Sequence, residues 1–320
     1  MSRGLSGCAH DVVHAIHRPM STSGRSRRLG LLWALFSAVG GALMVIPWKL
    51  ANEIGDPGIS VLLLLLTAAI GSTGLGLAQR VVGRSLPRGF RRIDLAVAAG
   101  LAVFTLAGNH ASAIAIQSLS PALLNVIMRF DFVFVAVLGW LLLGERVEGR
   151  FWIGAAIAVG GLVVLQGPGD VSDFSSFFDS GTFYGIAAAA FFSCMAILTR
   201  RFIHRIDTVA VNSMRLWFSV IFWFAYNPLP DIAAIPVEQV GYTTLAAIFG
   251  PFLGRLALMN SARHLEARVT TLATLSTPVM TLVLAFFVLG DWPLLHQLLG
   301  GAIMIGGIAI PLLPRPASSR

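Results

Sequence analysis

The residues of this chain that could bind a solute or carry a proton lie inside long apolar stretches. In chain order they are Asn109, His110, Asn125, Arg129, Asp131, Asn212 and Arg215. A charged side chain within a membrane segment is costly and marks a functional position by default. An arginine can hold an anionic group, and an imidazole or a carboxylate can carry a proton. The set therefore indicates binding and movement of a small molecule.

Arg129 and Asp131 are the most closely spaced of these charges. They are two residues apart, which is about 200° around a helix, so each needs its own partner. Asn125 precedes Arg129 by four residues and shares its face. In one interpretation, Arg129 holds an anionic group of the substrate while Asp131 carries a coupling proton. In the other, both belong to a structural ion-pair network, because buried ions need partners in any fold.

Arg215 is a further charge, in a later apolar stretch that also contains Asn212. Counting about 1.5 Å per residue from the predicted membrane edges places Arg215 and Asp131 at similar depths. We therefore predict an Asp131–Arg215 ion pair that links the two halves of the chain. The alternative is that Arg215 extends to the membrane interface.

Polar residues at other positions allow weaker hypotheses. His110, beside Asn109, could titrate near neutral pH and gate transport, or it could be a structural hydrogen-bonding group. Asn260 and Arg268 follow the eighth predicted helix and could reach the inner mouth of a cavity. The other charged residues of that connection, including Arg255, are expected to be solvated in the cytoplasm.

Two tryptophans are candidates for a cavity wall. Trp48 follows a proline, and Trp217 lies two residues after Arg215. Tryptophans near helix ends more often anchor a protein at the membrane interface, which is the competing interpretation.

The sequence lacks the motifs of several enzyme classes. It contains no G-x-x-x-x-G-K-[ST], H-E-x-x-H or G-x-S-x-G pattern, and its two cysteines form no cluster with histidines. These patterns would indicate an ATP motor, a zinc enzyme or a serine hydrolase. We expect no enzymatic activity, no cofactor and no metal, and we expect transport to be facilitated or driven by an ion gradient.

The composition is that of a membrane protein. The chain has 320 residues, of which 56% are hydrophobic and only 12% charged, whereas soluble domains carry about 25% charge. The net charge of +8 could indicate nucleic acid in a soluble chain. Here the arginines lie between apolar stretches, where they mark cytoplasmic loops, so we expect no nucleic-acid partner.

The hydropathy pattern predicts an all-α integral membrane protein with ten transmembrane helices. They span residues 30–50, 59–78, 95–116, 121–143, 152–165, 181–198, 209–226, 240–254, 269–289 and 295–313. With both termini in the cytoplasm, 20 of the 23 basic residues lie on the cytoplasmic side. This bias supports that topology.

The second half of the chain repeats the first. A shift of 146 residues places Leu-Gly-Glu at 143–145 on Leu-Gly-Asp at 289–291, with seven identities over 143–164. Each half has five predicted helices, so the second enters the membrane from the opposite side, and the two form inverted repeats. The small-residue pairs Ala156/Gly160 and Ala302/Gly306 are expected to allow close helix contact within one protomer, with homodimerisation as the alternative.

These elements divide the chain into five regions. They are a cytoplasmic basic tail (1–28), a first five-helix repeat (29–166), a periplasmic linker (167–180), a second five-helix repeat (181–313) and a cytoplasmic tail (314–320). The first tail is polar and is expected to be disordered, and Met20 offers an alternative start because nothing before it has a structural pattern.

At the repeated segments the chain resembles the EamA-like transporters of the drug/metabolite transporter superfamily. The resemblance rests on a fourth helix ending in Leu-Gly-Glu, a glycine-rich fifth helix, and their second copies at 272–291 and 300–310. Ser276-Thr277-Pro278 is similar to the ninth-helix pattern of the family, whereas Phe132 stands where Pro278 has its counterpart. The resemblance implies a central cavity between the halves and movement of metabolites or drugs, often outward.

We therefore expect a secondary transporter of a small organic metabolite or drug in the bacterial cytoplasmic (inner) membrane. It would work by alternating access, export its substrate and use a proton as coupling ion. Its partners would be the small-molecule substrate and the lipid bilayer. A non-transporting membrane sensor or assembly factor on the same fold is the alternative, because such a protein need not expose one cavity to both sides.

Overall fold

A computed structural model describes residues 24–81, 92–144, 149–166, 180–202, 208–262, 264–265, 275–290 and 292–310. Within these ranges the chain is helical and contains no strand. Most of both predicted tails, nearly all of the predicted linker, and Arg268, Glu145 and Asp291 lie outside the described residues.

The helices of the first half follow the predicted order. They are α2 (Gly24–Ile54), α3 (Pro57–Val81), α4 (Arg92–Ser118), the continuous path α5 (Pro121–Ile127), η1 (Met128–Phe130) and α6 (Asp131–Leu143), and α7 (Gly149–Gln166). The second half contains α9 (Ser180–Phe202), α10 (Thr208–Tyr226), the short turn η2 (Ile232–Ala234), the path α11 (Val237–Ala247), η3 (Ile248–Gly254) and α12 (Arg255–Ala262), then α14 (Thr277–Leu289) and α15 (Leu295–Ala309).

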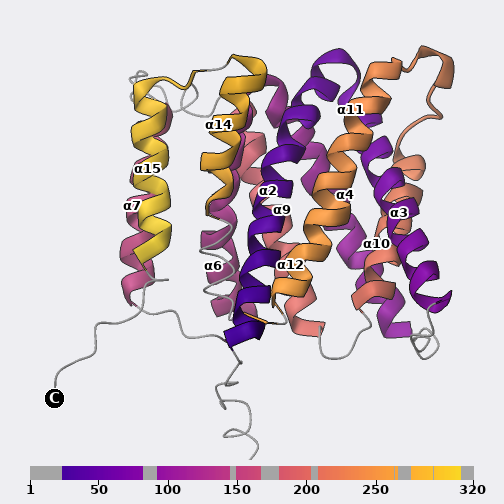
Figure 1. Cartoon of the computed structure of the whole chain (residues 1–320), viewed down its shortest axis with the longest axis horizontal. Coiled ribbons are helices and arrows are strands. Elements are labelled where there is room, and N and C mark those ends of the chain that lie inside the picture. Colours follow the sequence, from indigo (N-terminus) through magenta and orange to yellow (C-terminus); the bar gives the residue numbers. More distant parts are fainter. Residues whose placement is uncertain are drawn as a thin grey trace, which may run out of the picture.

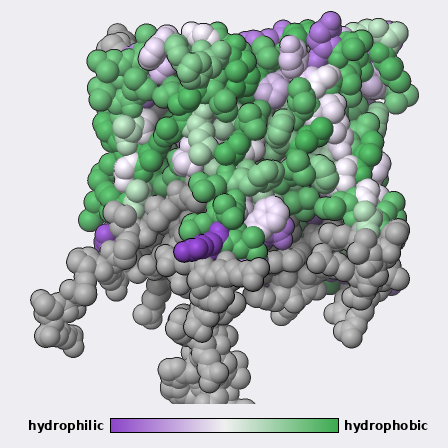
Figure 2. Space-filling view, in the orientation of Figure 1, coloured by the Kyte–Doolittle hydropathy of each residue, from purple (hydrophilic) through white to green (hydrophobic). Residues whose placement is uncertain are grey.

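The helices form a bundle (Figure 1), and many of their large apolar side chains are exposed. Five of the helical segments are long and apolar enough to cross a membrane: 28–54, 57–78, 92–118, 121–142 and 181–199. Leu141, Ile153 and Phe287 are among many large hydrophobic residues that are exposed. Figure 2 shows a mostly hydrophobic side surface with hydrophilic residues near its two edges. Such a surface fits a lipid environment and not water.

The start of α2 and the end of α15 lie at the same end of the bundle (Figure 1). This placement agrees with an even number of crossings, because each crossing carries the chain to the opposite side.

Two helical paths are interrupted near their middle. The path from Pro121 tightens into the 3₁₀ turn η1 although it has no proline there. The path from Val237 widens into the π-helical turn η3, which contains Pro251. A proline lacks the N–H of the regular helix and clashes with the carbonyl four residues earlier, and a π turn can accommodate it.

The eighth predicted helix does not end at Gly254. It continues through α12 to Ala262, so the predicted boundary at 254 is wrong. The π turn keeps the path continuous and brings it close to α2. A Cβ added at Gly254 would lie 2.5 Å from the carbonyl oxygen of Phe249, and one added at Gly40 would lie 2.8 Å from the same oxygen. Only glycine allows the backbones of α2 and η3 to come this close.

The two helices that end in Leu-Gly end alike. Gly144 has φ +67° and Gly290 has φ +71°, and both follow the last residue of their helix. This left-handed conformation favours glycine and stops the helix. The shift of 146 residues that relates the two sequences therefore also relates two equivalent helix ends.

Helices α7 and α15 lie side by side (Figure 1) and contact through Gly161 and Gly307. A Cβ added at Gly161 would lie 2.5 Å from the backbone nitrogen of Met304. A Cβ added at Gly307 would lie 2.7 Å from the backbone nitrogen of Ala158. Each contact maps onto the other by the same shift of 146 residues.

The predicted small-residue pairs Ala156/Gly160 and Ala302/Gly306 do not make this contact. All four residues are exposed, and a Cβ added at Gly160 or Gly306 would meet nothing within 4 Å. The predicted contact within the protomer is therefore wrong for these pairs, and Gly161 and Gly307, one residue after Gly160 and Gly306, make it instead. Homodimerisation through the exposed pairs stays the alternative prediction.

Candidate functional site

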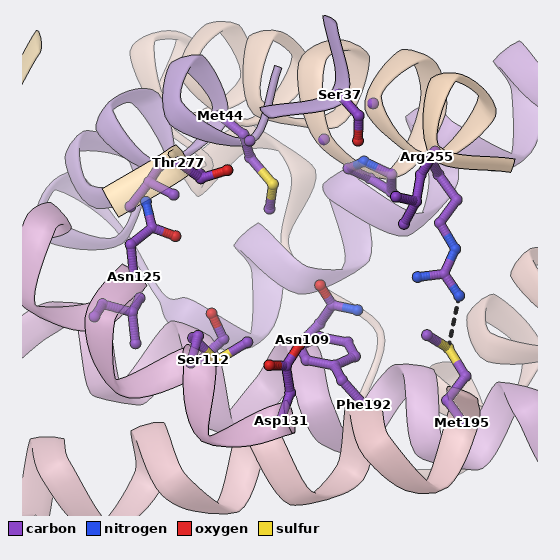
Figure 3. Close-up of a pocket in the computed structure, with 18 of the residues that line it drawn as sticks. Ser37, Met44, Asn109, Ser112, Asn125, Asp131, Phe192, Met195, Arg255 and Thr277 are labelled. Carbon is purple, nitrogen blue, oxygen red and sulfur yellow. Dashed lines mark hydrogen bonds between the residues drawn. The ribbon is translucent and has the colours of Figure 1, made fainter. Parts of the chain in front are cut away.

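A cavity of about 460 Å³ lies at the centre of the bundle. Its wall takes residues from α2, α3, α4, α5, η1 and α6 in the first half of the chain. The second half contributes α9, α10, η3, α12 and α14. The interrupted paths through η1 and η3 both border it, so each places side chains at the cavity where a regular helix is broken. Figure 3 shows side chains from several of these helices facing the same space.

Four charged residues line the cavity, namely Arg129, Asp131, Arg215 and Arg255. The first three are among the residues that the sequence marks as candidates. Arg255 is not, because it was expected to be solvated in the cytoplasm, and that prediction is wrong. The continuation of η3 into α12 keeps Arg255 inside the bundle. The described wall therefore carries three guanidinium groups and one carboxylate.

Arg215 is held by neighbours from three helices. Its Nη1 donates to the hydroxyl of Thr105 at 3.0 Å and contacts the sulfur of Met195 at 3.0 Å. Its Nη2 donates to Oδ1 of Asn212 at 2.9 Å. The side chain is only 5% exposed, and its Nε has no hydrogen-bond partner.

The predicted Asp131–Arg215 ion pair does not form, although both residues line the same cavity. An ion pair within 4 Å does form between Lys49 and Glu53, at 2.9 Å. Two residues at the same depth in the membrane can still point in different directions. The rotation of α10 about its axis directs Arg215 towards Thr105 and Met195.

Arg255 reaches the same sulfur atom as Arg215. Its Nη2 lies 3.7 Å from Sδ of Met195 (Figure 3). The two arginine nitrogens are therefore no more than about 7 Å apart, a separation at which two unit charges repel each other appreciably in a protein interior. The charge of Arg255 acts on Arg215 accordingly. A thioether sulfur is only a weak hydrogen-bond acceptor and carries no negative charge.

Asp131 begins α6 and borders the cavity. None of the described side chains donates a hydrogen bond to its carboxylate, and Arg129 is close enough for its positive charge to act on it. The backbone carbonyl of Asp131 accepts from the hydroxyl of Ser193 at 3.1 Å, which fixes the start of α6 against α9. The Nε of Arg129 is buried without a partner.

Neutral polar groups complete the wall. Asn125 in α5 donates to the hydroxyl of Thr281 in α14 at 2.6 Å, and that hydroxyl donates to the carbonyl of Thr277 at 3.0 Å. Trp48 donates from its indole to the hydroxyl of Ser112 at 3.3 Å. The amide of Asn109 donates to the carbonyl of Thr105 at 2.7 Å. Trp48 and Asn109 therefore line the cavity as well.

The Asn125–Thr281 bond joins the first half of the chain to the second, and both residues are buried. We expect Thr281→Val to lower the free energy of unfolding by about 1–3 kcal/mol, because it leaves the buried amide of Asn125 without its acceptor. We expect Asn125→Leu to lower it by about 0.5–1.5 kcal/mol, because the hydroxyl of Thr281 still donates to Thr277. The double variant should lose less than the sum of the two single losses. Thermal unfolding of all four forms measures this coupling, and additive losses would contradict a direct interaction.

Four candidate residues lie outside the cavity wall. His110 is exposed on α4, and Asn260 is absent from the wall although it lies in α12. Trp217 is 38% exposed and donates to the hydroxyl of Thr73 at 3.0 Å. Asn212 does not border the cavity but holds Arg215.

The cavity wall also contains residues that could not be selected from the sequence. Phe132, Phe192, Met44 and Met195 form apolar parts of the wall. In a chain this hydrophobic, their types carry no signal that separates them from lipid-facing residues. Arg255 did carry a signal. It is a charged residue directly after an apolar stretch, and such a residue can lie inside the helix bundle as well as in a solvated loop.

Comparison with known proteins agrees with this architecture. The model of the EamA-like transporter family matches residues 28–166 and again residues 179–313. A relative from Streptantibioticus cattleyicolor, "Probable terminal-alkyne amino-acid exporter", is 24% identical over 287 residues, which cover 87% of this chain and 92% of the relative. "Uncharacterized inner membrane transporter YhbE" of Escherichia coli K12 is 26% identical over 83% of each chain.

A shorter relative and a solved structure are also similar to this chain. "Probable 4-amino-4-deoxy-L-arabinose-phosphoundecaprenol flippase subunit ArnE" of Salmonella newport is 29% identical over 103 residues, covering 32% of this chain and 93% of the relative. A solved structure described as "Crystal structure of protein" superposes with a TM-score of 0.63 at 18% identity, over 91% of this chain and 99% of the other. That likeness concerns the fold. Because the family model matches nearly the whole described chain, the protein belongs to the EamA-like transporter family.

Proposed function

We propose that this protein is a secondary transporter that exports a small organic metabolite or drug by alternating access, driven by protons. The observation that carries the proposal is the central cavity, whose wall combines charged side chains from both halves of the chain. Secondary transporters bind substrate near the middle of the membrane at the interface of two repeats. A cavity of about 460 Å³ also falls within the range of small-molecule sites.

The proposal includes ten membrane crossings arranged as two inverted five-helix repeats. The reciprocal contacts at Gly161 and Gly307, and the equivalent left-handed glycines that end α6 and α14, support it. So do the two matches to one family model. Inverted repeats give two similar end states, one open to each side, and rocking of one half against the other exchanges them.

The direction and the location are part of the proposal. A relative over most of the chain is named an exporter, and another is named an inner membrane transporter. The excess of arginine in the segments between helices supports a bacterial inner membrane protein with both termini in the cytoplasm.

Export can be tested in a bacterial host that produces the protein. Extracellular metabolites of cells with the wild-type protein are compared with those of cells carrying Val135→Trp, which fills the cavity from α6. We expect one or more compounds to be enriched severalfold with the wild-type protein and not with the variant. Val159→Trp is the matched control, because Val159 is 47% exposed on α7 and the larger side chain would face lipid.

The comparison separates the transporter from the sensor. Equal profiles for the wild-type protein and Val135→Trp, with both shown in the membrane in equal amounts, would contradict export. A sensor would instead keep the profiles equal while still binding a ligand in the purified form.

A further inference from the structure

The two guanidinium groups at Met195 have no counter-ion among the described residues. Arg215 and Arg255 come from different helices, α10 and α12, and converge on one sulfur atom at 3.0 and 3.7 Å. No described carboxylate lies within ion-pair distance of either group. The arrangement thus brings two positive charges together around a neutral, weakly accepting atom.

The hydrogen-bonding capacity of this pair is incompletely used. Arg215 is 5% exposed and its Nε has no partner. Among the described residues, Arg255 makes one long contact, to the sulfur of Met195, and it lines the cavity. A buried charge without a partner is strongly unfavourable, so the structure favours any anion that can reach both groups. A planar carboxylate suits the guanidinium fork because it can accept two parallel hydrogen bonds.

The rest of the cavity wall indicates what the uncharged part of such an anion is like. Trp48, Phe132 and Phe192 border the same cavity, and the other charges of the described wall are Arg129 and Asp131. Counting formal charges, the wall carries three positive groups and one negative group, so a neutral or cationic solute would leave it unbalanced. Aromatic and apolar surfaces bind the hydrophobic part of a ligand.

We propose that Arg215 and Arg255 form a carboxylate-binding site and that the transported molecule is a carboxylate with an apolar or aromatic body. The second part rests on the transport function proposed above, whereas the first concerns binding alone. A carboxylate bound between the two groups offsets their mutual repulsion with two charge-assisted interactions.

The test measures binding by the purified protein in lipid nanodiscs. The probes are phenylacetate and its neutral isostere phenylacetamide, followed by benzoate and benzamide, and the readout is isothermal titration calorimetry. We expect each acid to bind more tightly than its amide to the wild-type protein. Arg215→Gln and Arg255→Gln should each weaken acid binding at least about tenfold, or about 1.4 kcal/mol, with little change for the amides. Arg201→Gln is the matched control, since Arg201 is exposed and outside the cavity wall.

A second readout does not depend on any ligand. Arg255→Gln removes one of two repelling charges and gives up only a weak contact to sulfur. We therefore expect the ligand-free variant to unfold at or above the wild-type Tm, although it has lost acid binding. Because this variant is expected to fold well, it keeps the test decisive if Arg215→Gln, which loses three contacts, is poorly folded.

Three results of the binding measurements would overturn the carboxylate site. They are acids that bind no more tightly than amides, acid binding that survives in folded Arg255→Gln, or an equal loss in Arg201→Gln. A clear decrease in the Tm of Arg255→Gln would also contradict it, because Arg255 would then be structural. Acid-selective binding without export in cells would uphold the site and reject transport, whereas export of a neutral compound without acid selectivity would reject the site alone.

Discussion

Replacing Gly161 or Gly307 with leucine should strongly lower both the yield of folded protein and its Tm. Both glycines lie where α7 and α15 touch, and a Cβ at either position would lie within 2.7 Å of a backbone nitrogen of the other helix. Backbone atoms cannot turn away as a flexible side chain can, so the helices would have to separate. Forcing extra methylenes into a packed interface costs about 1–3 kcal/mol even where side chains adjust, and we expect a larger loss here. Size-exclusion chromatography and thermal unfolding of detergent-solubilised protein measure it.

The adjacent glycines provide the control. Gly160→Leu and Gly306→Leu make the same chemical change one residue earlier, at exposed positions with nothing within 4 Å of an added Cβ. Leucine has a higher helix propensity than glycine, so these variants should be as stable as the wild-type protein or slightly more so. Similar losses at 160 and 161, or a loss at 161 without one at 307, would contradict the reciprocal contact between the helices.

The position of these helices could be predicted from the sequence, but their rotation could not. Long apolar stretches predict where helices lie because the bilayer demands about 20 apolar residues. In a water-soluble helix, an apolar stripe shows which face points inward. Helices α7 and α15 are apolar all round, with Ile153 and Ile303 exposed, so nothing in the pattern separates Gly160 from Gly161. The two glycines differ only in the structure, where Gly161 lies against the backbone of α15 and Gly160 does not.

The charged part of the site could be predicted for a related reason. Charges are rare inside a membrane, so Arg129, Asp131 and Arg215 could be selected by type alone, and the structure brings all three to one cavity. Their partners depend on helix rotation, which explains why the predicted Asp131–Arg215 pair is absent. Arg255 was missed because the charges after residue 254 look like a solvated connection, whereas the π turn η3 continues into α12 and keeps the path helical past Arg255.

Asp131→Asn should abolish proton-driven accumulation of substrate while leaving exchange of substrate across the membrane intact. The carboxylate borders the cavity and receives no hydrogen bond from a described side chain, so the amide should not unfold the protein. The amide of asparagine does not bind and release a proton near neutral pH. A carrier that depends on the Asp131 carboxylate would therefore lose its coupling to the proton gradient. The substrate can still cross in both directions, because the cavity keeps its shape.

Proteoliposomes with the compound identified in the export assay measure both activities. Uptake against a concentration gradient is followed with an imposed pH difference, and exchange is followed without one. We expect Asp131→Asn to lose the first and retain the second. Asp231→Asn is the matched control, because Asp231 is exposed at the turn η2 and caps it through an oxygen that asparagine also has.

The remaining outcomes assign Asp131 a different role. Accumulation that persists in Asp131→Asn would place the proton carrier elsewhere, and loss of both activities in a folded variant would mean that the carboxylate contacts the substrate. The charge of the cavity separates these cases further. Asp131→Asn makes the wall more positive, so phenylacetate should bind as tightly or more tightly if Asp131 serves coupling alone. Weaker binding would instead show that Asp131 holds part of the substrate, since loss of a negative charge should otherwise favour an anion.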